Sequence, residues 1–326
     1  MVWVRANDVT TRVGWAARAR AGPTPLLVAV LLVLVLTSCS AGPGGGGVTL
    51  RVTQFPWSAA KLTTAILAEI AAEHPELGVA GFKTIPVGTS MAWAGAQRGE
   101  VDLMDEVDMP NQQPLAAKAA AQMVLVHQTY GGAQQGWFVP TYALAPGQPL
   151  AGLHSVTQLN DYAAALGGEL VDSDPSFITT EENAKRLAGY GIHLRQVTSS
   201  EAAQLAELRR AYERHLPILV YLYHPHWVFQ EFQMTQLSEP NPPRPDCFTT
   251  GNGACAMPAY SAWTAAKKDL AQRAPRFWAM LNHFELTIPD IEAMLKNVDV
   301  DKESVQDVAH RWVAAHPQLI EQWTKA

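Results

Sequence analysis

Two cysteines near residue 250 are placed to form a small disulfide loop. Cys247 and Cys255 flank a glycine-rich turn at residues 249–253, and an oxidising compartment would allow them to pair. Two free thiols are the alternative. A zinc site is disfavoured because the chain has three cysteines in all, so no second pair completes a thiolate set. The sequence therefore predicts a disulfide here, provided that this part of the chain is exported.

The third cysteine follows a segment that is typical of an export signal. Arginines precede an unbroken apolar run at residues 26–36, whereas a membrane-spanning helix needs roughly 20 apolar residues. The run closes on Leu36-Thr37-Ser38-Cys39, which resembles the processing site of bacterial lipoproteins. We therefore expect residues 1–38 to be a lipoprotein signal peptide, Cys39 to be lipidated and the glycine-rich residues 39–47 to be a flexible tether. The mature protein would then be an extracytoplasmic lipoprotein, anchored to a membrane.

Other patterns that carry chemistry are absent from the sequence or weak. No Gly-x-Ser-x-Gly elbow, His-Glu-x-x-His helix, phosphate-binding loop or Gly-x-Gly-x-x-Gly turn occurs, so we expect neither an enzyme nor a cofactor. His224 and His226 would share a strand face only in an extended segment, and Pro225 lies between them; a metal-ion receptor is therefore the weaker alternative. The net charge of -6 provides no basic face for nucleic acid.

The elements that must position functional residues alternate between strands and helices. Residues 48–53 alternate in polarity as a strand does, and residues 59–72 carry apolar side chains at helical spacing. The alternation includes a helix at residues 157–166 and reaches a buried strand at residues 217–223, which predicts an α/β fold. From residue 261 onward the pattern predicts helices only. Periodicity leaves open two lobes with a cleft between them or one large doubly wound domain.

Five short motifs, in order along residues 48–326, resemble a known family of solute receptors. The most specific is Tyr221-Leu-Tyr-His-Pro-His-Trp-Val-Phe-Gln-Glu-Phe-Gln-Met-Thr-Gln-Leu237, which resembles the Pro-His-Trp signature of the glycine betaine/choline substrate-binding family. The other four motifs are Phe55-Pro56-Trp57, residues 99–106, residues 136–142 and residues 253–258. One such motif is weak evidence, whereas five in the family's order are specific.

The resemblance implies a two-lobed type II periplasmic-binding fold in which the chain crosses twice between the lobes. Lobe I would comprise residues 48–138 and 258–326, and lobe II residues 139–257. The protein would be the monomeric substrate-binding component of a bacterial ABC importer, with a membrane permease and its ATPase subunits as partners. Its ligand would be a small quaternary-ammonium solute such as glycine betaine or choline, with an amino-acid-like osmolyte as an alternative.

A quaternary ammonium group has no N–H to donate, so aromatic faces must hold it. The family's pattern makes Trp57, Trp137 and Trp227 the expected walls of a cage, with Phe177 and Tyr142 as further candidates. Core packing is expected for the tryptophans of the C-terminal part, Trp263, Trp278, Trp312 and Trp323.

A betaine carboxylate would also need hydrogen-bond donors. We expect them from the free backbone N–H groups at the start of the helix after Trp57, around residues 58–61. The side chain of His226, inside the Pro-His-Trp motif, is the second expected donor.

The segment after residue 104 departs from the family's pattern. Where many relatives place an aromatic side chain before a proline, this chain has Asp108-Met109-Pro110. Met109 can line a methylammonium site through its polarisable sulfur but has no aromatic quadrupole, so one wall is expected to be missing. The nearby Asp105, Glu106 and Asp108 could accept a choline hydroxyl or form a solvated loop.

Overall fold

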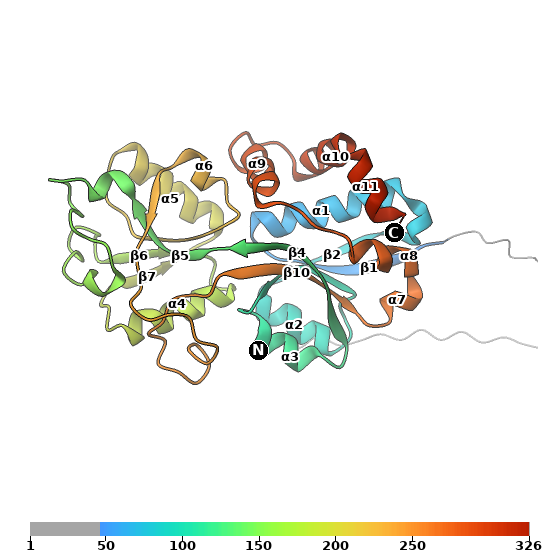
Figure 1. The fold of residues 1–326 in the computed structure, drawn as a ribbon, viewed down its shortest axis with the longest axis horizontal. Coiled ribbons are helices and arrows are strands. Elements are labelled where there is room, and N and C mark those ends of the chain that lie inside the picture. Colours follow the sequence, from blue (N-terminus) through green and yellow to red (C-terminus); the bar gives the residue numbers. More distant parts are fainter. Residues whose placement is uncertain (1–45, 326) are drawn as a thin grey trace, which may run out of the picture. The chain divides into compact units, whose positions relative to one another are not determined.

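The computed structural model describes residues 46–325. In this range the chain forms two β-sheets with helices packed against them (Figure 1), which confirms the predicted α/β class and the presence of two lobes. The predicted signal peptide, the lipidation site Cys39 and the tether up to residue 45 lie outside the described residues. No helix of the described range is long and apolar enough to span a membrane.

The first sheet has the strand order β2-β1-β3-β10-β4. Its strands are β1 (Val48–Gln54), β2 (Val79–Pro86), β3 (Leu103–Met109), β4 (Met123–Ala133) and β10 (Tyr260–Lys267). β1 pairs in parallel with β2 and β3, and β10 runs antiparallel between β3 and β4. The expectation of helices only after residue 261 is therefore wrong. The alanines of β10 have little strand preference, and pairing with two neighbours holds this segment as a strand.

Helices cover both faces of this sheet. α1 (Ser58–Glu73) buries Leu62, Ile66 and Ile70, at the i, i+4 spacing that predicts a helix. α1 lies on one face, and α2 (Thr89–Gln97) and α3 (Gln113–Ala119) lie on the other (Figure 1). The C-terminal helices are α7 (Leu270–Arg273), α8 (Pro275–Leu281), α9 (Ile288–Asp299), α10 (Val305–Ala315) and α11 (Pro317–Thr324), and a 3-10 turn, η1 (Pro75–Leu77), precedes β2. We call the first sheet with these helices the first lobe.

Trp312 and Trp323 stack on each other inside the first lobe, with ring centroids 6.2 Å apart. Both side chains are buried in its core, as expected for tryptophans of the C-terminal helices. Trp263 and Trp278 are half-buried and pack against the same core.

The second sheet has the strand order β7-β6-β8-β5-β9. Its strands are β5 (Gln135–Pro140), β6 (Glu169–Asp172), β7 (Arg195–Thr198), β8 (Val220–Tyr223) and β9 (Met234–Gln236). β6 pairs in parallel with β7 and β8, and β5 is antiparallel to β8 and β9. Its helices are α4 (Ile178–Gly189), α5 (Glu201–Glu213) and α6 (Val228–Glu231), with 3-10 turns η2 (Thr141–Leu144) and η3 (Val156–Gln158). We call this unit the second lobe.

The helix expected at residues 157–166 is replaced by η3 and a series of turns. Asn160 explains part of the difference, because its amide donates to the carbonyl of Gly191 and accepts from the backbone N–H of His193. Such side-chain bonds to a distant backbone compete with a regular helix.

The chain passes twice between the lobes. β4 ends at Ala133 and β5 begins at Gln135, and the chain returns to the first sheet at Tyr260. Residues 135–138, expected in lobe I, pair with β8 of the second sheet; the other lobe limits stay predictions. Cys247 and Cys255 are joined by a disulfide, which closes a loop on the return path.

Candidate functional site

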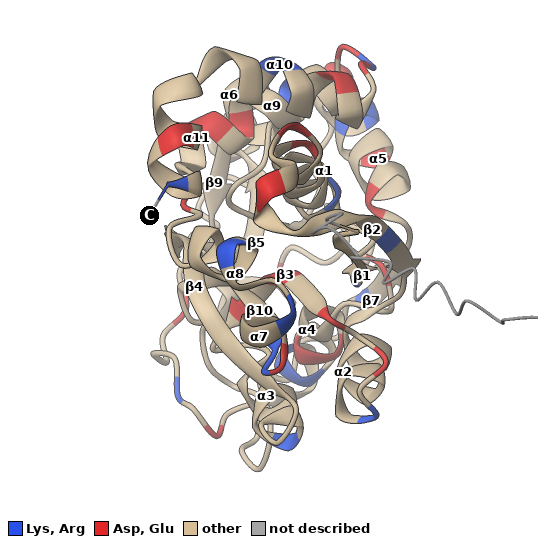
Figure 2. Ribbon diagram, turned by 90° about the vertical axis from the view of Figure 1, so that its right-hand side faces the viewer, with Lys and Arg blue, Asp and Glu red and all other residues tan. Residues whose placement is uncertain are grey.

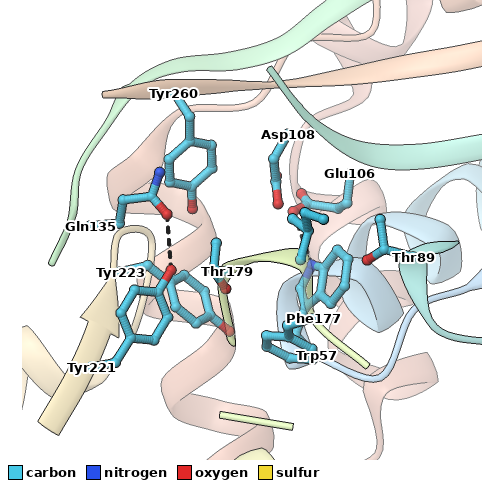
Figure 3. A pocket seen from close by; sticks show the side chains of 11 residues that line it. Trp57, Thr89, Glu106, Asp108, Gln135, Phe177, Thr179, Tyr221, Tyr223 and Tyr260 are labelled. Carbon is cyan, nitrogen blue, oxygen red and sulfur yellow. Dashed lines mark hydrogen bonds between the residues drawn. The ribbon is translucent and has the colours of Figure 1, made fainter. Parts of the chain in front are cut away.

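A small pocket lies where the two lobes meet (Figure 3). Its lining residues are Trp57, Thr89, Glu106, Asp108 and Tyr260 from the first lobe, and Gln135, Phe177, Ile178, Thr179, Tyr221 and Tyr223 from the second. The free volume is about 20 Å³, which holds about one water molecule. A solute therefore has to move the lobes or these side chains apart before it enters.

The ends of parallel strands bring this set together. Trp57 follows β1, and Phe177 follows β6. The carboxylates of Glu106 and Asp108 lie at the end of β3. Tyr221 and Tyr223 are two residues apart on β8, so their side chains leave the same face of the strand. Open α/β sheets bind ligands beyond the carboxyl ends of their strands, and here the ends from both sheets line one pocket.

Trp57 is held firmly by its aromatic neighbours. Phe55 stacks on it at 4.6 Å between ring centroids and an interplanar angle of 6°. Phe177 of the second lobe meets it edge-on at 5.0 Å and 77°. These are favoured aromatic geometries, so the Trp57 ring is oriented before any ligand arrives.

Two carboxylates face these rings, buried Glu106 and half-buried Asp108. Oε2 of Glu106 accepts hydrogen bonds from the hydroxyl of Tyr130 (2.7 Å) and from Nε1 of Trp57 (3.4 Å), whereas its Oε1 has no partner. Figure 3 shows Asp108 beside Glu106, with its carboxyl group directed into the space between Tyr260 and Trp57. The pocket is therefore strongly acidic.

Burial raises the pKa of both carboxyl groups. The pKa of Asp108 rises to about 7. The pKa of Glu106 rises well above its ordinary value because of burial and of the nearby charge of Asp108. No lysine, arginine or histidine lines the pocket, and in the view of Figure 2 the Lys and Arg residues are scattered over separate elements. A bound cation would supply the missing countercharge.

Asp105, the third acidic candidate, faces the opposite side of β3. Its carboxylate accepts hydrogen bonds from the hydroxyls of Thr63 (2.7 Å) and Thr64 (2.9 Å) on α1. Asp105 and Glu106 are buried, so the alternative of a solvated acidic loop is wrong.

Of the expected aromatic walls, the structure brings Trp57 and Phe177 into the pocket. Trp137 lies in the core of the second lobe, fully buried. Its Nε1 donates to Oδ1 of Asn183 at 2.8 Å, and the guanidinium of Arg186 covers its ring at 4.0 Å. Tyr142 lies on η2 and donates to the carbonyl of Leu216. Neither Trp137 nor Tyr142 lines the pocket.

The tyrosine walls were not identified from the sequence. Tyr221 and Tyr223 lie inside the Pro-His-Trp motif region, and their spacing of two on an expected strand was a usable signal. Tyr260 had no such signal, because its strand was read as the beginning of a helical region.

Trp227 lines a separate cavity next to the pocket. Phe177, Ser58 and Glu201 line that cavity too, and the guanidinium of Arg209 lies 5.2 Å from the Trp227 ring. Met109 is half-buried against the first core, and it lines neither the pocket nor this cavity.

The two histidines of the Pro-His-Trp motif lie next to different carboxylates. Nδ1 of His224 lies 2.9 Å from Oε1 of Glu292. Nε2 of His226 lies 3.6 Å from Oε1 of Glu201, and its Nδ1 accepts from the backbone N–H of Val228. His226 is buried outside the pocket, so the structure does not present it as a donor to a ligand there.

The start of α1 already carries a carboxylate partner. The backbone N–H and hydroxyl of Ser58 donate to Oε2 of Glu201, at 2.9 Å and 3.1 Å. The expected free donor at residue 58 is therefore occupied. Burial alone would raise the pKa of Glu201, but the neighbouring ring of His226 and hydrogen bonds from Tyr223 and Ser58 hold its pKa below the ordinary value.

Glu201 thus joins the second lobe to the first. The change of Glu201 to Gln should remove the charge from this junction and lower the free energy of unfolding by about 1–2 kcal/mol, the usual size of a charge-assisted hydrogen bond. Urea unfolding followed by circular dichroism measures the change. Glu207→Gln, at a position on the same helix that is bonded to Arg210 at the surface, should change stability by less than about 0.5 kcal/mol. Equal losses in the two variants would contradict the inferred junction.

An α/β protein with two sheets, two chain crossings and a pocket between its lobes has the architecture of a solute receptor. Lactococcal OpuAC, closed and complexed with glycine betaine, has a similar fold, with a TM-score of 0.70 and 20% identity over 85% of this chain and 99% of that one. The glycine betaine/L-proline-binding protein ProX of Borrelia burgdorferi gives a TM-score of 0.72 and 20% identity, covering 85% and 97%. An ABC-transporter choline binding protein in complex with choline gives 0.70 and 18%, covering 84% and 91%. These similarities confirm the two-lobed periplasmic-binding fold.

The family follows from the sequence itself. Residues 48–315 match the substrate binding domain of ABC-type glycine betaine transport system, and the chain belongs to this family. Among curated proteins, the glycine betaine/carnitine transport binding protein GbuC of Listeria monocytogenes is 28% identical over 127 residues. That match covers 39% of this chain and 38% of the relative, so it spans about two-fifths of that protein's length.

Proposed function

We propose that this protein is the extracytoplasmic substrate-binding component of an ABC importer and that it binds a small quaternary-ammonium solute of the glycine betaine and choline class between its lobes. The observation that carries the proposal is the composition of the interlobe pocket. Aromatic rings from both lobes surround the buried carboxylate of Glu106 and the half-buried carboxylate of Asp108, and no basic side chain lines the space.

The chemistry of the pocket suits a methylated cation. A desolvated cation over an aromatic face gains about 2 kcal/mol, and Trp57, Tyr221, Tyr223 and Tyr260 are available as faces. The carboxylates of Glu106 and Asp108 add a countercharge that is expensive to bury alone. The rings come from both lobes, so binding would favour the closed arrangement over an open one.

The partners follow from the family and from the leader sequence. A substrate-binding domain of this family would deliver its solute to a membrane permease with ATPase subunits, as a monomer. Residues 1–38 would direct export and Cys39 would carry the lipid anchor. The disulfide between Cys247 and Cys255 supports an oxidising compartment outside the cytoplasm.

Calorimetric titration of the mature chain with choline, glycine betaine, proline betaine and carnitine tests the proposal. We expect at least one of them to bind with a Kd of about 1–100 μM, which corresponds to about 5.5–8 kcal/mol. The control is 3,3-dimethylbutanol, which has the shape of choline without its charge and should bind at least about 100-fold more weakly. Binding of zinc with no binding of any ammonium solute would instead favour a metal-ion receptor.

A further inference from the structure

The hydroxyl groups of the tyrosine walls already donate hydrogen bonds to other groups of the protein. Tyr221 donates to Oε1 of Gln135 at 2.9 Å (Figure 3). Tyr223 donates to the carboxylate of Glu201, and Tyr260 donates to the backbone carbonyl of His224. The walls therefore offer aromatic faces to a ligand but few free O–H donors.

The remaining polar groups of the pocket supply few donors. Nε1 of Trp57 already donates to Glu106, and the amide nitrogen of Gln135 donates to the carbonyl of Pro258 at 2.9 Å. The hydroxyl of Thr89 is buried without a partner. A ligand carboxylate in this pocket would thus meet the hydroxyls of Thr89 and of Thr179 at the start of α4, and no basic side chain.

Acceptors, in contrast, are present in excess. Glu106 is 1% exposed, and its Oε1 has no hydrogen-bond partner. The carboxyl group of Asp108 lies beside it and lines the same space (Figure 3). A buried acceptor without a donor is costly, so the site is complete only when a ligand brings a positive charge and a donor.

We infer that the pocket selects an organic cation that has no carboxylate and carries an O–H or N–H donor near its charged nitrogen, and that Glu106 and Asp108 are the specificity-determining residues. This inference rests on the proposed function and narrows its ligand class. At pH 8 the carboxyl group of Asp108 is ionised, because burial raises its pKa only to about 7. A zwitterionic betaine would then place its own carboxylate beside this charge, and like charges brought together at a binding site oppose association.

Two ligands with the same head group test the inference. Choline and glycine betaine share a trimethylammonium group, but choline ends in a hydroxyl and glycine betaine in a carboxylate. Titration of the mature chain at pH 8 should give a Kd for choline at least about 100-fold lower than for glycine betaine. Protonated dimethylaminoethanol, which replaces one methyl group with an N–H donor, should bind at least as tightly as choline.

Substitutions that keep the size of the side chain test whether Asp108 and Glu106 determine the selectivity. Asp108→Asn should reduce the ratio of the two Kd values at least about 10-fold, and Glu106→Gln should also reduce it. Asp105→Asn changes the neighbouring carboxylate that faces α1, and it should leave the ratio unchanged. If Asp108→Asn does not fold, the ratio in the unchanged protein and in Glu106→Gln decides.

The outcomes separate the inference from the proposed function. Glycine betaine binding as tightly as choline overturns the inference and leaves the proposed function standing. A ratio that stays at the original value in both folded variants also overturns it, because the selectivity would then lie elsewhere. Absence of binding by any ammonium ligand overturns the proposed function.

Discussion

Trp57→Ala is expected to raise the Kd for the solute at least about 100-fold. The indole forms one face of the pocket, and its Nε1 is one of two donors to the buried carboxylate of Glu106. The substitution removes a cation–π contact of about 2 kcal/mol and the apolar burial of a large ring. It also removes the ring on which Phe55 stacks and which Phe177 meets edge-on. Calorimetric titration, supported by circular dichroism to check folding, measures the effect.

Two other tryptophans provide matched controls. Trp137→Phe changes a ring that lies in the core of the second lobe, and Trp227→Phe changes a ring in the neighbouring cavity. Both variants should keep the Kd within about 3-fold of the original value. Loss of binding in Trp227→Phe together with retention in Trp57→Ala would show that the solute occupies the neighbouring cavity.

The sequence predicted the class of fold well because its signals are local. Alternating polarity in β1 and helical spacing in α1 are properties of short segments, and five motifs in order indicated the family that residues 48–315 match. β10 was missed because its alanines have little strand preference and its polar and apolar residues do not alternate clearly. Its identity is set by β3 and β4, which are more than 125 residues away in the chain.

The walls of the pocket were predicted less completely. Trp57 follows a strand directly, and the end of a strand is where a ligand site is expected. Trp137 lies within β5, and the direction of its side chain depends on which face of the sheet is covered. That face is set by distant partners such as Arg186. The sequence shows that residue 137 is aromatic, but the packing of the sheet determines whether the Trp137 side chain faces the ligand.

The prediction of a free donor for a betaine carboxylate at residue 58 was wrong for the same reason. The start of α1 has the free N–H groups that any helix has, and the sequence gives no sign that one is occupied. Glu201, 143 residues along the chain, supplies the carboxylate. Because this contact joins the two lobes, only the folded structure could reveal that the expected anion position is already filled.

Binding of an organic cation is expected to strengthen as pH rises from about 5 to about 8. Burial raises the pKa of Asp108 to about 7 and the pKa of Glu106 well above its ordinary value. The free protein therefore holds protons in the pocket at neutral pH, and a bound cation favours the ionised carboxylates. Binding releases these protons, so the affinity should rise up to about tenfold per pH unit for each proton released and level off above the pKa of each group.

The same raised pKa values set the sign of the stability change without ligand. A carboxyl group whose pKa is higher in the folded state stabilises that state at low pH, and this contribution is lost as pH rises through the folded-state pKa. The melting temperature of the ligand-free protein should accordingly fall between about pH 5 and pH 8, and the shift produced by choline should grow over the same range.

Titrations in two buffers of different ionisation enthalpy count the protons that are released when the cation binds. Asp108→Asn should release fewer protons than the unchanged protein, because one titrating group is gone. Tyr130 and Tyr260 also face the carboxylates, but raised pKa values keep both hydroxyls protonated over this pH range. An affinity that is independent of pH, with no proton release, would mean that the carboxylates do not contact the cation.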